Sequence, residues 1–163
     1  MTGFVDRADR EGPLPYSAFV EWALYDDEIG FYGGGSGSAG RREGDFLTSP
    51  EVGPLFGAVL ARAVDGWWRA LGEPDPFVVV EAGAGPGTLA RTVLVAGPDC
   101  GPALRWVLVE RSARQRERHA AHLPLTPAEM AFGPEDADSD RPQPAGRGPL
   151  VVSLGELPRL GAP

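Results

Sequence analysis

The most informative stretch of the chain runs from Val78 to Leu89 and reads V-V-V-E-A-G-A-G-P-G-T-L. It predicts a buried strand, an acidic residue at the end of that strand, three glycines at alternate positions and the start of a helix. Such a turn leaves backbone N–H groups at the positive end of a helix, where an anion or a polar ligand head is stabilised. Glycines also let a ligand lie against bare backbone. The stretch therefore indicates a ligand-binding turn.

The glycine spacing and Glu81 favour one class of ligand. A dinucleotide-binding turn has the pattern G-x-G-x-x-G, but here Gly87 comes one residue early and Thr88 stands where Gly or Ala is preferred. Glu81 would also lie near the pyrophosphate of NAD or FAD, and two like charges 4 Å apart repel by about 4 kcal/mol at an effective dielectric of 20. The same carboxylate would attract the ammonium and sulfonium groups of S-adenosylmethionine (SAM). A nicotinamide dehydrogenase half-site and a tight turn without a ligand are the alternatives.

Two more acidic residues lie at or just after the ends of later predicted strands. Glu110 ends the strand predicted over residues 105–110. An acid at this place commonly accepts hydrogen bonds from both ribose hydroxyls of a bound ligand, a geometry that SAM and NAD sites share. Glu156 follows the strand predicted over residues 150–154, in a G-E-L-P turn. A solvated strand-end carboxylate is the alternative interpretation of both residues.

The segment Gly44–Glu51, with the sequence G-D-F-L-T-S-P-E, combines a helix start with residues that a helix start does not need. Ser49 is expected to cap the helix, and Pro50 suits its first position. Asp45 and Phe46 have no capping role. A compact polar and aromatic turn before a helix is a candidate ligand contact.

Other reactive residue types do not form a recognisable site in the sequence. His119 and His122 lie among arginines on the helix predicted over residues 112–123, so we expect them to be solvated. Cys100 stands in a loop without an activating partner, and a single cysteine excludes an intrachain disulfide. No Cys/His cluster has metal-ligand spacing, so no metal is expected.

Composition limits the class of protein. The 163 residues have the length of one domain, and a net charge of −8 argues against a nucleic-acid or anionic-membrane partner. No apolar run approaches the ~20 residues of a membrane span, and no signal segment opens the chain. These observations predict a cytoplasmic protein.

The hydrophobic pattern changes character near residue 74. Before it, residues 1–12 are polar and expected to be loose, helices are predicted over 15–25 and 49–71, and a glycine–serine loop covers 33–38. After it, predicted strands alternate with predicted helices, over residues 77–82, 87–96, 105–110, 112–123 and 150–154. This alternation predicts a parallel sheet with right-handed crossovers and both faces covered.

Taken together, these segments resemble the MidA-like family of class I SAM-dependent methyltransferases. The matching segments occur in the order Gly12–Leu14, Gly30–Tyr32, Gly44–Glu51, Leu55–Gly57, Glu81–Leu89 and Val109–Ser112. The most specific part is the combination of G-D-F-x-T-S-P-E with E-x-G-x-G-x-G further along the chain.

The resemblance implies an α/β, Rossmann-like class I methyltransferase sheet, incomplete with strands 1–3, behind a helical N-terminal extension. The extension or cap would be residues 1–73, with its glycine-rich loop, and residues 74–163 would be the N-terminal half of the SAM-binding domain. Asp45 and Glu51 would hold a cationic substrate. The implied SAM contacts are Phe46, Thr48, Glu81, Gly83, Gly85, Gly87, Thr88, Glu110 and Glu156. Mitochondrial relatives in this family are associated with protein arginine methylation and with respiratory complex I assembly, so a protein substrate is implied.

Members of the family are longer than this chain, which ends where a fourth strand is expected. In the usual strand order 3-2-1-4-5-7-6, the chain supplies strands 3, 2 and 1, so Phe77–Val80 is predicted to be an exposed apolar edge. The chain is therefore expected to be an N-terminal part of a methyltransferase, needing its C-terminal half or self-association through that edge. A non-catalytic remnant that binds SAM or acts through contacts is the alternative.

Overall fold

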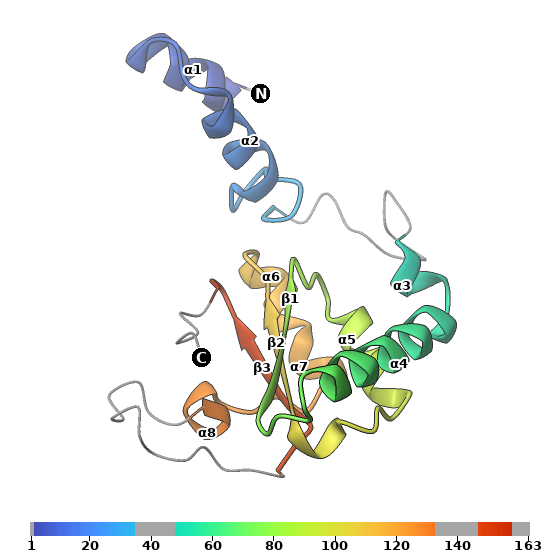
Figure 1. Ribbon diagram of the computed structural model, residues 1–163. Coiled ribbons are helices and arrows are strands. Elements are labelled where there is room, and N and C mark those ends of the chain that lie inside the picture. The colour runs from blue at the N-terminus through green and yellow to red at the C-terminus, as the bar shows by residue number, and fades with distance from the viewer. Residues whose placement is uncertain (1, 35–47, 133–146, 158–163) are drawn as a thin grey trace. The chain divides into compact units, whose positions relative to one another are not determined.

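The computed structural model describes residues 2–34, 48–132 and 147–157 (Figure 1). The chain divides into two compact units, Met1–Phe46 and Leu47–Pro163. The helical segment that the sequence assigned to one N-terminal extension is therefore shared between the two units. In the described residues, no helix is long and apolar enough to cross a bilayer.

In the first unit, the described residues 2–34 form the helices α1 (Thr2–Glu11) and α2 (Tyr16–Tyr25). The ring of Phe4 in α1 lies 5.3 Å, between centroids, from the rings of both Phe19 and Trp22 in α2. The prediction that residues 1–12 are loose was wrong. Although these residues are mostly polar, they include Phe4, whose ring contacts lie in the following helix.

The second unit is built on a parallel sheet of β1 (Phe77–Ala82), β2 (Leu104–Val109) and β3 (Leu150–Leu154), in the order β1-β2-β3. All six residues of β2 are buried. Within the described residues, β1 has a neighbouring strand on one side only. The predicted strands, their parallel pairing and the edge position of β1 are confirmed.

The helices of this unit are shorter than predicted, because two of them are interrupted. Their bounds are α3 (Ser49–Val52), α4 (Pro54–Ala70), α5 (Thr88–Val95), α6 (Ala113–Glu117), α7 (His119–His122) and α8 (Ala128–Phe132), with a 3₁₀ turn η1 (Gly101–Ala103). The helix predicted over 49–71 breaks at Gly53, whose backbone is extended. Proline at position 54 disfavours helical dihedrals at the residue before it.

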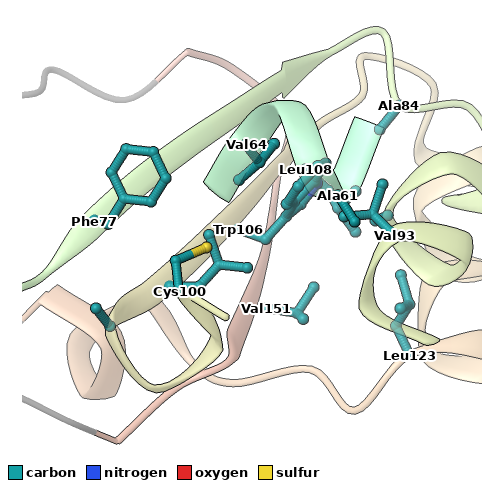
Figure 2. Close-up of a cluster of buried hydrophobic side chains, with 13 residues drawn as sticks. Ala61, Val64, Phe77, Ala84, Val93, Cys100, Trp106, Leu108, Leu123 and Val151 are labelled. Carbon is teal, nitrogen blue, oxygen red and sulfur yellow. The ribbon is translucent and has the colours of Figure 1, made fainter. Parts of the chain in front are cut away.

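The core of the unit lies between the sheet and the helices α4 and α5 (Figure 2). Leu104, Trp106 and Leu108 are alternate residues of β2 and share one face of the sheet, where they belong to the same cluster as Val64 of α4 and Val93 of α5. Each of these five side chains is at most 1% exposed. This packing fixes α5, and with it the turn that leads from β1 into α5.

Cys100 lies in this core and is unreactive, as the sequence indicated. The Asp65 carboxylate accepts the N–H groups of Asp99, at 3.0 Å, and of Cys100, at 2.9 Å. Burial and the Asp65 carboxylate raise the pKa of the Cys100 thiol to about 12. The thiol therefore stays protonated at neutral pH and acts as a small apolar group.

The contact between α4 and α5 gives a stability prediction. A Cβ at Gly57 would lie 2.7 Å from the backbone carbonyl carbon of Thr92, whereas a Cβ at Gly66 in the same helix would meet nothing within 4 Å. We expect Gly57→Ala to lower the free energy of unfolding by about 1–3 kcal/mol through overpacking. Gly66→Ala should raise it by about 0.5–1 kcal/mol through helix propensity. Urea unfolding measures both, and equal effects of the two variants would contradict the packing of α4 on α5.

Candidate functional site

Five of the predicted site residues, Glu81, Gly83, Gly85, Gly87 and Glu110, lie where the parallel strands β1 and β2 end. The turn after β1 folds over the end of β2, because the N–H groups of Gly83 and Ala84 donate to the Val109 carbonyl at 2.8 and 3.1 Å. The Glu110 N–H in turn donates to the Leu154 carbonyl of β3 at 3.0 Å. Backbone hydrogen bonds therefore hold three strand ends together, at the edge where ligands bind in open α/β sheets.

The three glycines of the turn serve different purposes. Gly83, Gly85 and Gly87 have φ values of 72°, 53° and 81°, which glycine adopts without the steric cost other residues pay. A Cβ at Gly83 or Gly85 would meet nothing within 4 Å, so these two border open space. A Cβ at Gly87 would lie 3.0 Å from the Leu123 side chain. The first two leave room for a ligand, and the third allows the turn to pack on the segment after α6.

The N–H groups of the turn point into the protein rather than outward. Besides the two bonds to Val109, the Gly85 N–H donates to Glu110 Oε2 at 2.8 Å, and the Gly87 N–H donates to the Ala84 carbonyl at 2.9 Å. These four N–H groups therefore have acceptors within the protein, namely the Val109 carbonyl of β2, the Glu110 carboxylate and the Ala84 carbonyl. The expectation that N–H groups at the start of α5 face a ligand stays a prediction.

Glu110 is a buried carboxylate, 8% exposed, that organises this edge. Its Oε2 accepts from Gly85, and its Oε1 accepts from the Ser112 N–H at 2.8 Å. A carboxylate oxygen has a second lone pair, so each oxygen can accept one more hydrogen bond. The ribose-binding role stays a prediction that these two bonds permit.

Glu81 is half-buried near the end of β1. The Trp106 indole Nε1–H donates to Glu81 Oε2 at 2.9 Å. Burial raises the pKa of the Glu81 carboxyl to about 7, although the hydrogen bond from Trp106 and the backbone N–H of Ala90 in α5 act in the opposite direction. The carboxyl therefore changes its charge near neutral pH, and a cationic ligand would favour its ionised form.

The prediction that His119 is solvated was wrong. Its side chain is completely buried rather than solvated. Its Nε2 lies 2.7 Å from the Gly85 carbonyl oxygen, and its Nδ1 lies 2.8 Å from the Ser153 Oγ. The pattern contained a usable signal, since Gln115, His119 and Leu123 recur at helical spacing and all three are buried. His122 is exposed, as predicted.

The other predicted site residues have local roles or lie elsewhere. Thr48, and not Ser49, is the N-cap of α3, and the Thr48 N–H donates to Glu51 Oε2 at 3.1 Å in a capping box. Thr88 is the first residue of α5. Glu156 is exposed after β3. Asp45 and Phe46 lie outside the described residues. Where the chain is described, no three His, Cys, Asp or Glu side chains come together as a metal ion requires.

Residues 59–144 match a family model described as "Putative S-adenosyl-L-methionine-dependent methyltransferase". Two curated relatives named mitochondrial protein arginine methyltransferases are also similar. The NDUFAF7 homolog of Drosophila melanogaster is 41% identical over 51% of this chain, and NDUFAF7 of Rattus norvegicus is 31% identical over 69% of it. The chain spans 18% and 26% of these two relatives. The cytoplasmic location predicted from the sequence stays a prediction.

The fold also matches solved structures. A COG1565 superfamily member from Burkholderia thailandensis, crystallised with S-adenosyl-homocysteine, is 32% identical with a TM-score of 0.60. The match covers 94% of this chain and 36% of that one. A second COG1565 superfamily structure from the same organism is 30% identical, with a TM-score of 0.56. The predicted methyltransferase-like sheet is confirmed.

The pKa of Glu81 predicts how stability depends on pH. Since the folded pKa of about 7 lies above the usual 4.5, the folded chain binds more protons than the unfolded chain between these values. The contribution of Glu81 to stability therefore falls as the pH rises from 4.5 to 7. We expect Glu81→Gln to remove this fall and to raise the free energy of unfolding at pH 8. Denaturant unfolding from pH 4.5 to 8 measures it, with exposed Glu117→Gln as the control. An unchanged pH slope in Glu81→Gln would contradict the burial of this carboxyl.

Proposed function

Because this chain belongs to the family of S-adenosyl-L-methionine-dependent methyltransferases that residues 59–144 match, we propose that it binds SAM at the carboxyl edge of its sheet. We further propose that the protein transfers the methyl group to an arginine side chain of a protein substrate. The observation that carries the proposal is the glycine turn. Gly83 and Gly85 border open space, the half-buried Glu81 lies near the end of β1, and the buried Glu110 follows β2.

The chemistry of these residues fits SAM. Glu110 retains an acceptor site on each oxygen for a ribose hydroxyl, and Glu81 can supply a negative charge that offsets a cationic ligand. Bound SAM supplies a methyl group on a positively charged sulfur, which a nucleophile displaces in line. The solved relative that is 32% identical binds S-adenosyl-homocysteine, the product of that reaction, which supports the proposal.

The protein side of the reaction is mostly positioning. Methyl transfer gains its rate from holding the nucleophile in line and from the charges around the sulfur. In our proposal the bare backbone at Gly83 and Gly85 lets the ligand approach closely, and the two carboxylates set its orientation. The arginine substrate is supported by the names of the fly and rat relatives.

A second candidate is SAM binding without catalysis by these residues. One observation favours it. Of the two residues expected to hold a cationic substrate, Glu51 already accepts a hydrogen bond from Thr48 in the cap of α3. In that case the chain would bind the cofactor product and transfer no methyl group to a peptide arginine.

Calorimetric titration with S-adenosyl-homocysteine tests the shared part of both candidates. We expect saturable binding, no binding of NAD, and loss of binding in Gly85→Arg, whose side chain would fill the open space beside the turn. Gly66→Arg is the matched control, since it adds the same side chain to the exposed surface of α4. Unchanged affinity in Gly85→Arg would overturn the assigned site. Transfer of labelled methyl to a mixture of arginine peptides then separates the enzyme from the binding protein.

The charge of Glu81 predicts a difference between the two ligands. SAM carries a sulfonium that S-adenosyl-homocysteine lacks, so ionised Glu81 should favour SAM. We expect the affinity for SAM, relative to that for S-adenosyl-homocysteine, to increase several-fold between pH 6 and pH 8, as Glu81 ionises with a pKa of about 7. Titrations of both ligands at three pH values measure this ratio. The ratio should be flat in Glu81→Gln, and a flat ratio in the unmodified chain would exclude contact with the sulfonium.

A further inference from the structure

His119 connects two elements of the site that are far apart in the sequence. It is the first residue of α7, and its ring lies between the Gly85 carbonyl of the turn after β1 and the Ser153 hydroxyl of β3. Both contacts are short, 2.7 and 2.8 Å, and the side chain has no exposed surface. These two contacts fix the orientation of the buried imidazole ring.

The partners of His119 determine its tautomer. A carbonyl oxygen can only accept, so the ring nitrogen facing Gly85 must carry a hydrogen. His119 therefore donates from Nε2 to the Gly85 carbonyl, and its Nδ1 accepts from the Ser153 hydroxyl. Burial lowers the pKa of His119 below its usual value, in spite of the Gly85 carbonyl and Glu110, so the neutral ring is favoured.

Side chains therefore hold both backbone polar groups of Gly85, its N–H and its carbonyl. Glu110 accepts its N–H at 2.8 Å, and His119 donates to its carbonyl at 2.7 Å. These two bonds come from β2's end and from α7, and they act on a glycine whose φ is 53° and whose Cα borders open space. Glycine is the most flexible residue of a chain, so a turn that must present a fixed surface needs such external bonds.

A purely structural role does not account for the choice of residue. An apolar side chain of similar size would fill the same volume without the cost of burying an imidazole. It would, however, leave the Gly85 carbonyl without its donor. The polarity of His119 is thus used on the carbonyl of Gly85, one of the two glycines of the turn whose Cα borders open space.

We propose that His119 is a positioning residue, which holds the Gly85 carbonyl through Nε2–H, with Ser153 fixing its tautomer, and so sets the glycine turn in its ligand-binding form. This inference rests on the proposed function, because the ligand is SAM or its product. His119 itself touches neither the methyl group nor the acceptor.

Two amide substitutions separate positioning from packing. The amide nitrogen of Gln reaches the place of Nε2, and that of Asn reaches the place of Nδ1. His119→Gln therefore keeps a donor for Gly85, whereas His119→Asn keeps a partner only for Ser153. We expect His119→Asn to weaken binding of S-adenosyl-homocysteine about tenfold, in line with an unpaired buried carbonyl. His119→Gln should weaken it no more than about threefold, although both variants lose thermal stability.

Variants of Ser153 and His122 provide the comparison. Ser153→Ala removes the donor to Nδ1 and should weaken binding about threefold. His122→Asn changes an exposed histidine in the same helix and should leave both affinity and stability unchanged. Circular dichroism identifies variants that do not fold. If His119→Asn is among them, Ser153→Ala carries the test, and an affinity equal to that of the unmodified chain would then overturn the inference.

A spectroscopic measurement tests the bond without a ligand. The chain has two histidines, so a long-range ¹H–¹⁵N correlation spectrum assigns both rings with one His122 variant. We expect the neutral ring of His119 at pH 8 to be protonated at Nε2 and bare at Nδ1. Protonation at Nδ1 alone would overturn the inference, since Nε2 could not then donate to Gly85.

The outcomes distinguish the inference from the proposed function. If the unmodified chain binds no S-adenosyl-homocysteine, the proposed function fails and the inference fails with it. If the unmodified chain binds and His119→Asn binds equally well, the proposed function stands and the inference alone is overturned. Equal losses in His119→Gln and His119→Asn would also overturn it, because packing would then explain the effect.

Discussion

The Glu110 carboxylate, buried at the end of the central strand, accepts the N–H groups of Gly85 and Ser112, and the candidate site is arranged around these two hydrogen bonds. One bond fixes the glycine turn after β1, and the other fixes the start of α6. A buried carboxylate requires such donors, because it has lost its contacts with water. The glycine turn and the start of α6 are therefore both held at the end of β2 by the same carboxylate.

The two acids at the strand ends, Glu110 and Glu81, have different surroundings. Glu110 is stabilised by two backbone donors, whereas Glu81 is held mainly by the indole of Trp106 and has a pKa raised to about 7 by burial. One carboxylate thus serves the architecture of the turn, and the other has a charge that depends on its surroundings. In the proposed site, Glu110 would face the ribose and Glu81 the cationic group of the ligand.

Most of the strands and turns could be predicted from local sequence patterns. The strands at residues 77–82 and 150–154 were predicted at their observed bounds, because short apolar runs next to glycine turns are typical of parallel strands. The positive φ values of Gly83, Gly85 and Gly87 agree with the glycine pattern. Helix ends were less well predicted. Thr48 rather than Ser49 caps α3, and Gly53 with the following proline divides one predicted helix into two.

The sequence by itself determined the parallel sheet, the glycine turn and the acids at the strand ends, because each depends on neighbouring residues and on the period of the hydrophobic pattern. Only the tertiary structure decided which groups meet. The N–H groups of Gly83 and Ala84 find an acceptor on β2, and His119 lies beside a carbonyl 34 positions earlier in the chain. Likewise, burial beside Trp106 sets the charge of Glu81. Hydrogen bonding and desolvation depend on distances in space, which residue spacing along a strand or helix does not specify.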